Sequence, residues 1–180
     1  MKELLLQSLE HARGVVLVYR TALECVVNGH LRREWETYFD QAENHVAILT
    51  RACIALGLDP GERTPGCEIV HHIGIGLVVA IKRAIATSDA QTAELVACEC
   101  LVLAETRHHA NWELLCACAN ALDDDSGRLL GDACGEIQDR EDERLQRVRS
   151  WSRELWLQSL GLEARLPPPA RMPSGKVAVG

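Results

Sequence analysis

Residues 101–119 read LVLAETRHHANWELLCACA, and this stretch decides the fold. Its apolar residues recur at alternating spacings of three and four, which places them along one face of a helix. Ionisable side chains, Glu105 and His108, interrupt that face. The stretch therefore predicts a long helix whose inward face carries both apolar and ionisable groups.

The same spacing continues outward from this stretch in both directions. Apolar tracks of this kind run from Leu5 to Val26, from Trp35 to Leu56 and from Leu130 to Leu155. Each helix would be on the order of 40 Å long at 1.5 Å per residue. Long antiparallel helices joined by short turns form a bundle, so the fold class is expected to be all-α.

Turn signals divide the chain into five expected helices. They cover about residues 2–28, 31–56, 67–86, 89–122 and 127–160, and the third is the shorter one. Gly29, Gly57 and Gly161 stand where a helix commonly stops. Residues 1–160 are expected to form one up-down bundle of four long helices plus the shorter helix between the second and third long ones. Residues 161–180, which contain three consecutive prolines at 167–169, are expected to form an extended tail.

Composition narrows the functional classes. The chain has 180 residues, 47% of them apolar and 25% charged, which is typical of a globular protein. Its formal net charge is −7, and without a basic patch it is not expected to bind nucleic acid. We found no apolar run near the roughly 20 residues that cross a bilayer and no signal peptide. The sequence therefore predicts no membrane segment and a cytoplasmic location.

Eight cysteines are distributed along the chain, and most lie within the helical patterns. None forms a CxxC pair. Small buried thiols of this kind are commonly reduced packing residues in intracellular proteins. We therefore expect the cysteines to be reduced residues of the core.

Ionisable residues recur on the inward faces of four expected helices. Glu24 flanks the first track, His45 lies on the second, Glu105 and His108 lie on the fourth helix, and Glu141 lies on the fifth. Ionised groups are costly in a core unless they are paired or bound to a metal. Their position on facing helices therefore indicates a shared site.

A metal centre is one interpretation of this site. Carboxylates and imidazoles are ligands for iron and manganese, and carboxylates can bridge two ions. In Glu105-Thr106-Arg107-His108 the first and last side chains share one helix face. Glu68 and His71 have the same spacing on the short third helix. The interpretation predicts one or two ions of iron or manganese held by Glu24, His45, Glu105, His108 and Glu141.

A structural network is the other interpretation. Glu24 can pair with Arg20 on the same helix, and a lone His45 is commonly a hydrogen-bonded core residue. Glu141 can pair with Arg144, three residues later, so that no metal is needed. Both interpretations stay open on the sequence.

Four short segments carry a resemblance to a known family. They are residues 40–46 on the second helix, Cys67 at the start of the third, residues 104–112 on the fourth and residues 139–141 on the fifth. With the order and length of the helices, they make residues 4–155 resemble the ferritin-like superfamily. Within it, the chain most resembles a bacterial family of small stress-associated ferritin-like proteins.

The resemblance implies that the Glu and His residues named above bind two metal ions, commonly iron, and that His71 lies outside the ligand set. Two positions depart from the family pattern. Ala42 stands three residues before His45, and Arg144 stands three residues after Glu141. An arginine in a ligand position repels a metal ion and can neutralise Glu141.

Two functions follow from these interpretations. In the first, the chain is a ferritin-like metal-binding protein that handles iron or peroxide, with an oxidase or peroxidase-like activity if the metal is redox-active and with Tyr38 as an outer hydrogen-bond donor. In the second, it is a non-enzymatic interaction or oligomerisation bundle whose Glu, His and Arg side chains form a metal-free network. In both cases we expect a homo-oligomer, most simply a dimer.

Overall fold

The computed structural model describes residues 1–137 and 141–163, apart from the side chain of Glu141. The described residues form six helices and no strand, so the all-α prediction is confirmed. The helices are α1 (Lys2–Ala22), α2 (Gly29–Ala55), α3 (Pro65–Thr87), α4 (Ala90–Ala121), α5 (Asp125–Gly135) and α6 (Glu141–Ser159). Of the expected tail, residues 164–180 lie outside the described part of the chain.

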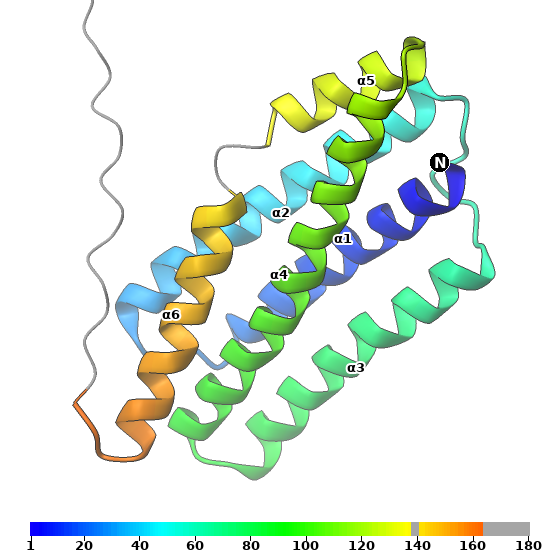
Figure 1. Cartoon of the computed structure of the whole chain (residues 1–180). Coiled ribbons are helices and arrows are strands. Elements are labelled where there is room, and N and C mark those ends of the chain that lie inside the picture. Colours follow the sequence, from blue (N-terminus) through cyan, green and yellow to red (C-terminus); the bar gives the residue numbers. More distant parts are fainter. Residues whose placement is uncertain (138–140, 164–180) are drawn as a thin grey trace, which may run out of the picture.

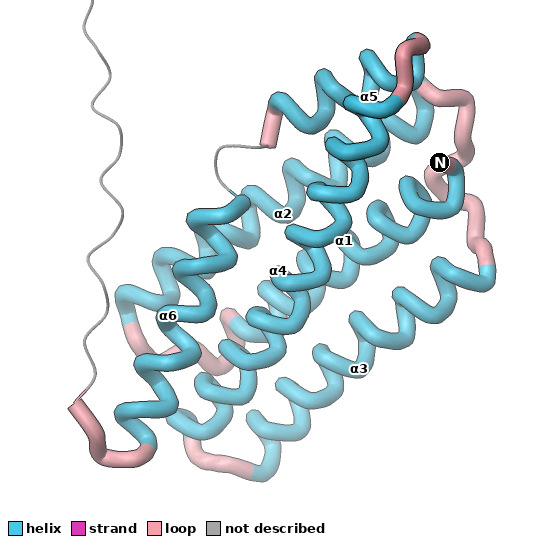
Figure 2. The backbone as a smooth tube through the Cα atoms, in the orientation of Figure 1, coloured by secondary structure: helices cyan, strands magenta, loops and turns pink. Residues whose placement is uncertain are grey.

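The helices form a bundle with α3 at one edge. α1 and α4 lie in the middle, and α6 lies on the side of α4 away from α3 (Figure 1). α3 packs against α1 and α4. The loops gather at the two ends of the bundle (Figure 2). Among the described residues, one long face of α3 therefore has no helix packed against it.

The first helix is shorter than the sequence predicts. α1 ends at Ala22 rather than near Asn28, and Gly29 begins the next helix instead of stopping the first. The reason is Asn28, whose side chain accepts hydrogen bonds from the backbone N–H groups of His30 and Leu31 and so caps α2. Gly57 and Gly161 do follow helix ends, with φ of 72° and 68°.

The expected single fifth helix is wrong. The structure has two helices here, α5 and α6, and α5 ends at Gly135. α5 contains three glycines, which lower helix stability by up to about 1 kcal/mol each relative to alanine. The third helix is also longer than expected, because Thr64 caps it and Pro65 occupies its first position.

The cysteine prediction is confirmed for the four free thiols that are buried, Cys53, Cys67, Cys98 and Cys100; Cys25 and Cys118 are free but only half-buried, and the prediction is wrong for two cysteines. Cys116 of α4 and Cys134 of α5 form a disulfide, whereas the remaining six cysteines are free. The two partners are nine residues on either side of Asp125, at the turn between the helices. An antiparallel α4–α5 hairpin brings such equidistant positions together, which is the signal in the sequence that could have identified the pair.

The buried interior consists of two apolar clusters with polar residues between them. On α4, Ala104 belongs to one cluster and Trp112 to the other, and Glu105 and His108 lie between them. Both polar residues are buried. The interior is therefore apolar toward both ends of the bundle and polar in a layer near the middle.

Candidate functional site

The polar layer is centred on a fully buried ion pair. The guanidinium Nη2 of Arg144 on α6 donates to Oε2 of Glu105 on α4 at 2.9 Å. Oε1 of the same carboxylate accepts a hydrogen bond from the Tyr19 hydroxyl on α1 at 2.6 Å. Glu105 is 1% exposed and Arg144 2%. Three helices are therefore joined through one carboxylate, both of whose oxygens have donors.

Two histidines complete the layer beside this pair. His45 of α2 and His108 of α4 stack in parallel, with Nδ1 of His45 2.9 Å from Nε2 of His108. The indole Nε1 of Trp112 also donates to Nε2 of His108, at 3.1 Å. Since an indole can only donate, Nε2 of His108 is an acceptor and His45 donates to it from Nδ1. The lone pair on that nitrogen, which a metal would need, is already occupied by two donors.

Both imidazoles are neutral at ordinary pH. Burial, followed by the charge of Arg144, lowers the pKa of His45 to about 3 and that of His108 well below its usual range. His11 of α1 packs near His108, and its Nε2 donates to the Ala104 carbonyl at 2.9 Å. Burial lowers the pKa of His11 to about 4. The positive charge in the described layer is therefore that of Arg144.

The structure brings together three of the five predicted metal ligands, His45, Glu105 and His108. It does not bring Glu24 to them, because α1 ends at Ala22 and Glu24 lies exposed in the following turn. The side chain of Glu141 lies outside the described residues. Across residues 1–137 and 142–163, no group of three or more His, Cys, Asp or Glu side chains has a geometry that could hold a metal ion.

The described groups fit an ion-pair network better than a metal centre. Arg144 was expected to compete for Glu141, whose side chain lies outside the described residues, and among the described residues Arg144 pairs with Glu105. Tyr19 lies within the first apolar track, from Leu5 to Val26, and burial, followed by the charge of Glu105, raises its pKa well above its usual range. Tyr38 lies edge-on to the Tyr19 ring rather than against the carboxylate. Because Tyr19 and Glu105 lie on different helices, no local pattern in the sequence identifies this pair.

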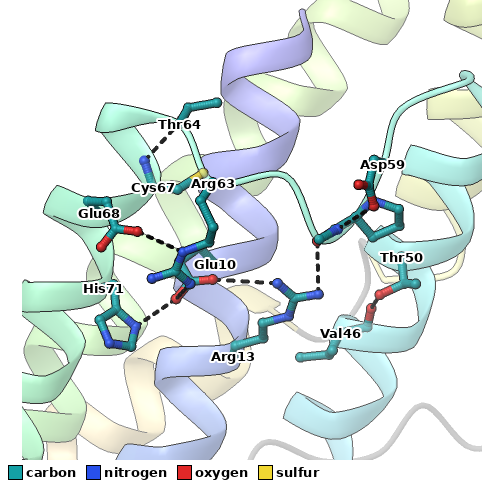
Figure 3. A network of polar contacts seen from close by, with 12 residues as sticks. Glu10, Arg13, Val46, Thr50, Asp59, Arg63, Thr64, Cys67, Glu68 and His71 are labelled. Carbon is teal, nitrogen blue, oxygen red and sulfur yellow. Dashed lines mark hydrogen bonds and ion pairs between the residues drawn. The ribbon is translucent and has the colours of Figure 1, made fainter.

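A second polar network fixes the start of α3 (Figure 3). The buried carboxylate of Glu10 on α1 accepts from Nδ1 of His71 at 2.8 Å and from Nη1 of Arg63 at 3.2 Å. Arg63 also donates through Nε to Glu68 at 2.8 Å. Nη1 of Arg13 is 3.5 Å from Glu10, and its Nη2 donates to the Pro60 carbonyl. His71 thus points toward α1, and the neighbouring turn of α3 is fixed in rotation.

The outer face of α3 is apolar and exposed. We define this outer face as the exposed residues on the side of α3 away from α1 and α4. They follow one another at spacings of three and four residues, and Val79 lies beside them. Its members are Ile69, His72, Ile73, Gly76, Val79, Ala80 and Arg83. Ile69 is 64% exposed, Ile73 52% and Val79 56%. Apolar surface of this kind in one strip commonly marks a contact with another molecule.

The expectation of no membrane-length helix is also corrected here. α3 is long and apolar enough to cross a membrane, judged by length and composition alone, with a mean hydropathy of 1.6 over its best window. Core helices of globular proteins pass the same test, but only 17% of this window is buried. The sequence prediction required an unbroken apolar run, which Glu68, His71 and His72 interrupt.

Two glycines of α3 have opposite environments. A Cβ on Gly74 would lie 3.3 Å from the Gly14 Cα, so this glycine permits the close crossing of α3 over α1. A Cβ on Gly76 would meet nothing within 4 Å. Glycine inside a helix is destabilising, and the packing within the described chain gives no reason for Gly76.

Comparisons with known proteins add no family: no protein-family model, no curated protein and no solved structure matches the chain.

Proposed function

We propose that the chain is a non-enzymatic helical-bundle oligomerisation module that assembles through the outer face of α3. In this proposal the polar layer is a structural Glu–His–Arg network. The observation that carries it is the exposed apolar strip on a helix that the Glu10 network holds in a fixed rotation. A rigid helix with one unpartnered apolar face is suited to binding a second protein surface.

The charges of the core support the same proposal. A buried Arg–Glu pair with further hydrogen bonds needs no additional cation to balance it. A metal ion at the imidazoles would have to displace two donors from Nε2 of His108 and lie near the guanidinium of Arg144. Both requirements disfavour ligation by the groups described.

The alternative is the ferritin-like metal-binding function that the sequence resemblance implies, with iron or manganese in the core. The observation in its favour is that His45 and His108 are neutral, which is the form of imidazole that binds metals. It requires Arg144 to leave Glu105, so that the carboxylate becomes available. An oxidase or peroxidase-like activity would belong to this alternative alone.

One experiment separates the two functions. The purified chain is loaded anaerobically with ferrous iron or manganese, desalted and passed over a sizing column with light scattering, and the metal in the protein peak is quantified. The assembly module predicts a mass above the 19.9 kDa of one chain and metal well below one ion per chain. A monomeric peak would contradict the assembly function. One or two ions per chain, lost in Glu105→Ala, would establish the metal function instead.

The cytoplasmic location expected from the sequence is part of the proposal and has its own test. Disulfides are rare in reducing compartments, so a cytoplasmic chain should have Cys116 and Cys134 as thiols in the cell. Alkylation at the moment of lysis, in denaturant so that the buried thiols react, should then modify all eight cysteines. Modification of only six would place the chain in an oxidising compartment.

A further inference from the structure

We infer that the partner of α3 is a second copy of this chain, and that the two α3 helices pair antiparallel about a two-fold axis at Gly76. This inference rests on the proposed function and names its partner and geometry. It depends on the outer face, on the position of Gly76 and on the charges at the two ends of the helix.

The outer face is complementary to itself in the antiparallel direction. In a pair centred on Gly76, each residue a given number of positions before the centre faces the residue the same number after it. Ile73 then faces Val79 of the second copy, and Ile69 faces the aliphatic stem of Arg83. Ile73 and Val79 are thus covered by each other, and Ile69, the most exposed of the three, is covered by methylene groups.

Gly76 lies at the point where the two helices would cross. Helix axes approach closely when a small residue occupies the crossing, and a Cβ at this position would have open space around it within one copy. Gly74 already has this use on the inner side, against Gly14 of α1. The second copy supplies the neighbour that Gly76 lacks in the described chain.

Charges at the ends of α3 favour the antiparallel direction. Glu68 lies near the start of the helix, and Lys82 and Arg83 lie near its end, all of them exposed. In the antiparallel pair Ile69 faces Arg83 of the second copy. Glu68 is the residue before Ile69, so its carboxylate lies next to this contact. Arg63 occupies Oε1 of Glu68, and the carboxylate offers Oε2 to this contact. Parallel pairing would instead place like charges together at both ends.

The charge of the whole chain also selects this surface for self-association. The net charge is −7, so two copies repel over most surfaces. α3 carries one acidic residue and two basic ones, which gives it a formal charge of +1 with neutral histidines. Contact through α3 therefore joins the copies at a segment that does not share the general negative charge.

Charge reversal by mixing tests the geometry. Glu68→Arg and Arg83→Glu are prepared separately, and the dissociation constant of each full-length variant is measured by sedimentation across a dilution series. In a dimer of either variant alone, position 68 of each copy lies near a like charge at position 83 of the other copy. We therefore expect the dissociation constant of each variant to rise at least tenfold over the wild type. The equimolar mixture restores both contacts as opposite charges and should return to within about threefold of the wild type. Thermal unfolding of each variant verifies that the copies are folded, because Glu68 also binds Arg63.

The outcomes distinguish this inference from the proposed function. If Ile73→Glu abolishes the dimer while neither charge variant weakens it, assembly through α3 stands and the antiparallel pairing is overturned. If the wild type is monomeric at every concentration and does not float with vesicles, both are overturned. Flotation of a monomeric wild type with phosphatidylcholine vesicles, lost in Ile73→Glu, would identify a lipid surface as the occupant and overturn the second copy.

Discussion

The polar layer of the core and the outer face of α3 depart from the usual distribution of side chains in opposite directions. The layer places Glu105 and Arg144 where apolar residues are normal, and the outer face places Ile69 and Ile73 in solvent. Inside, the charged groups find donors and acceptors on neighbouring helices. Outside, the described chain supplies no cover for the apolar groups. The difference supports the proposal that the layer stabilises the fold and that the outer face binds a partner.

Breaking the ion pair should have the largest effect on stability. Arg144→Met leaves the Glu105 carboxylate buried without its cation, which costs about 3–5 kcal/mol. Glu105→Gln removes the carboxylate charge that Arg144 contacts at 2.9 Å, which should also be costly, and the double variant should recover part of the loss. Urea unfolding gives the free energies. Single changes that cost less than about 1 kcal/mol would show that the layer does not hold the bundle together.

Acid should weaken the layer through its neutral histidines. The folded pKa of His11 is about 4, below the unfolded value near 6.5, so the unfolded chain binds the extra proton between these values. Stability is therefore complete above about pH 6.5 and falls as the pH drops toward 4. The loss between about pH 7.5 and 5 is roughly 2 kcal/mol for His11.

The control for the histidine prediction is His11→Gln, which keeps a donor for the Ala104 carbonyl and removes the titration. The free energy of unfolding of this variant should fall by about 2 kcal/mol less than that of the wild type over the same pH interval. Equal losses in the two proteins would show that His11 is not held neutral by the fold.

The two glycines of α3 sharpen the comparison within one helix. Gly76→Ala adds a methyl group in open space and should stabilise the folded copy by about 0.5–1 kcal/mol through helix propensity. Gly74→Ala forces the Gly14 backbone to shift and should lose that gain or reverse it. Thermal unfolding at a concentration where the chain is monomeric measures both. A destabilising Gly76→Ala would mean that this position is already packed within the chain.

A charge on the outer face should have the smallest effect on the folded copy. Ile73→Glu removes a side chain that is 52% exposed, so the free energy of unfolding of the monomer should change by no more than about 0.5 kcal/mol. Urea unfolding at high dilution measures this change. A loss of several kcal/mol would show that Ile73 belongs to the interior of the bundle.

The sequence predicts the helices well where the signals are local. Helical periodicity follows from neighbouring residues, and the fourth expected helix begins at Asp89, which caps α4. The caps at Asn28 and Thr64 were not predicted. The end of α1 was misplaced because the six residues after it are also apolar enough to continue a helix. α1 nevertheless ends at Ala22, because Asn28 caps the next helix and because Val26 packs in the core.

The candidate site was predicted in part, for a physical reason. Periodicity identified Glu105, His108 and His45 as inward-facing, and all three are buried, but only the two histidines contact each other. Periodicity does not say which partner a buried carboxylate takes, since Arg144 and Tyr19 come from helices far away in the sequence. The exposure of α3 is likewise a tertiary property, because an apolar helix has the same sequence whether it is buried or uncovered.

The most direct test is the mass in solution of a matched pair of variants. Ile73→Glu lies on the outer face, and Leu114→Glu changes a residue of nearly equal exposure, 53%, on α4. Light scattering across a dilution series should give about twice the 19.9 kDa chain mass for the wild type and Leu114→Glu, and the mass of one chain for Ile73→Glu. Equal masses for the two variants would contradict assembly through α3.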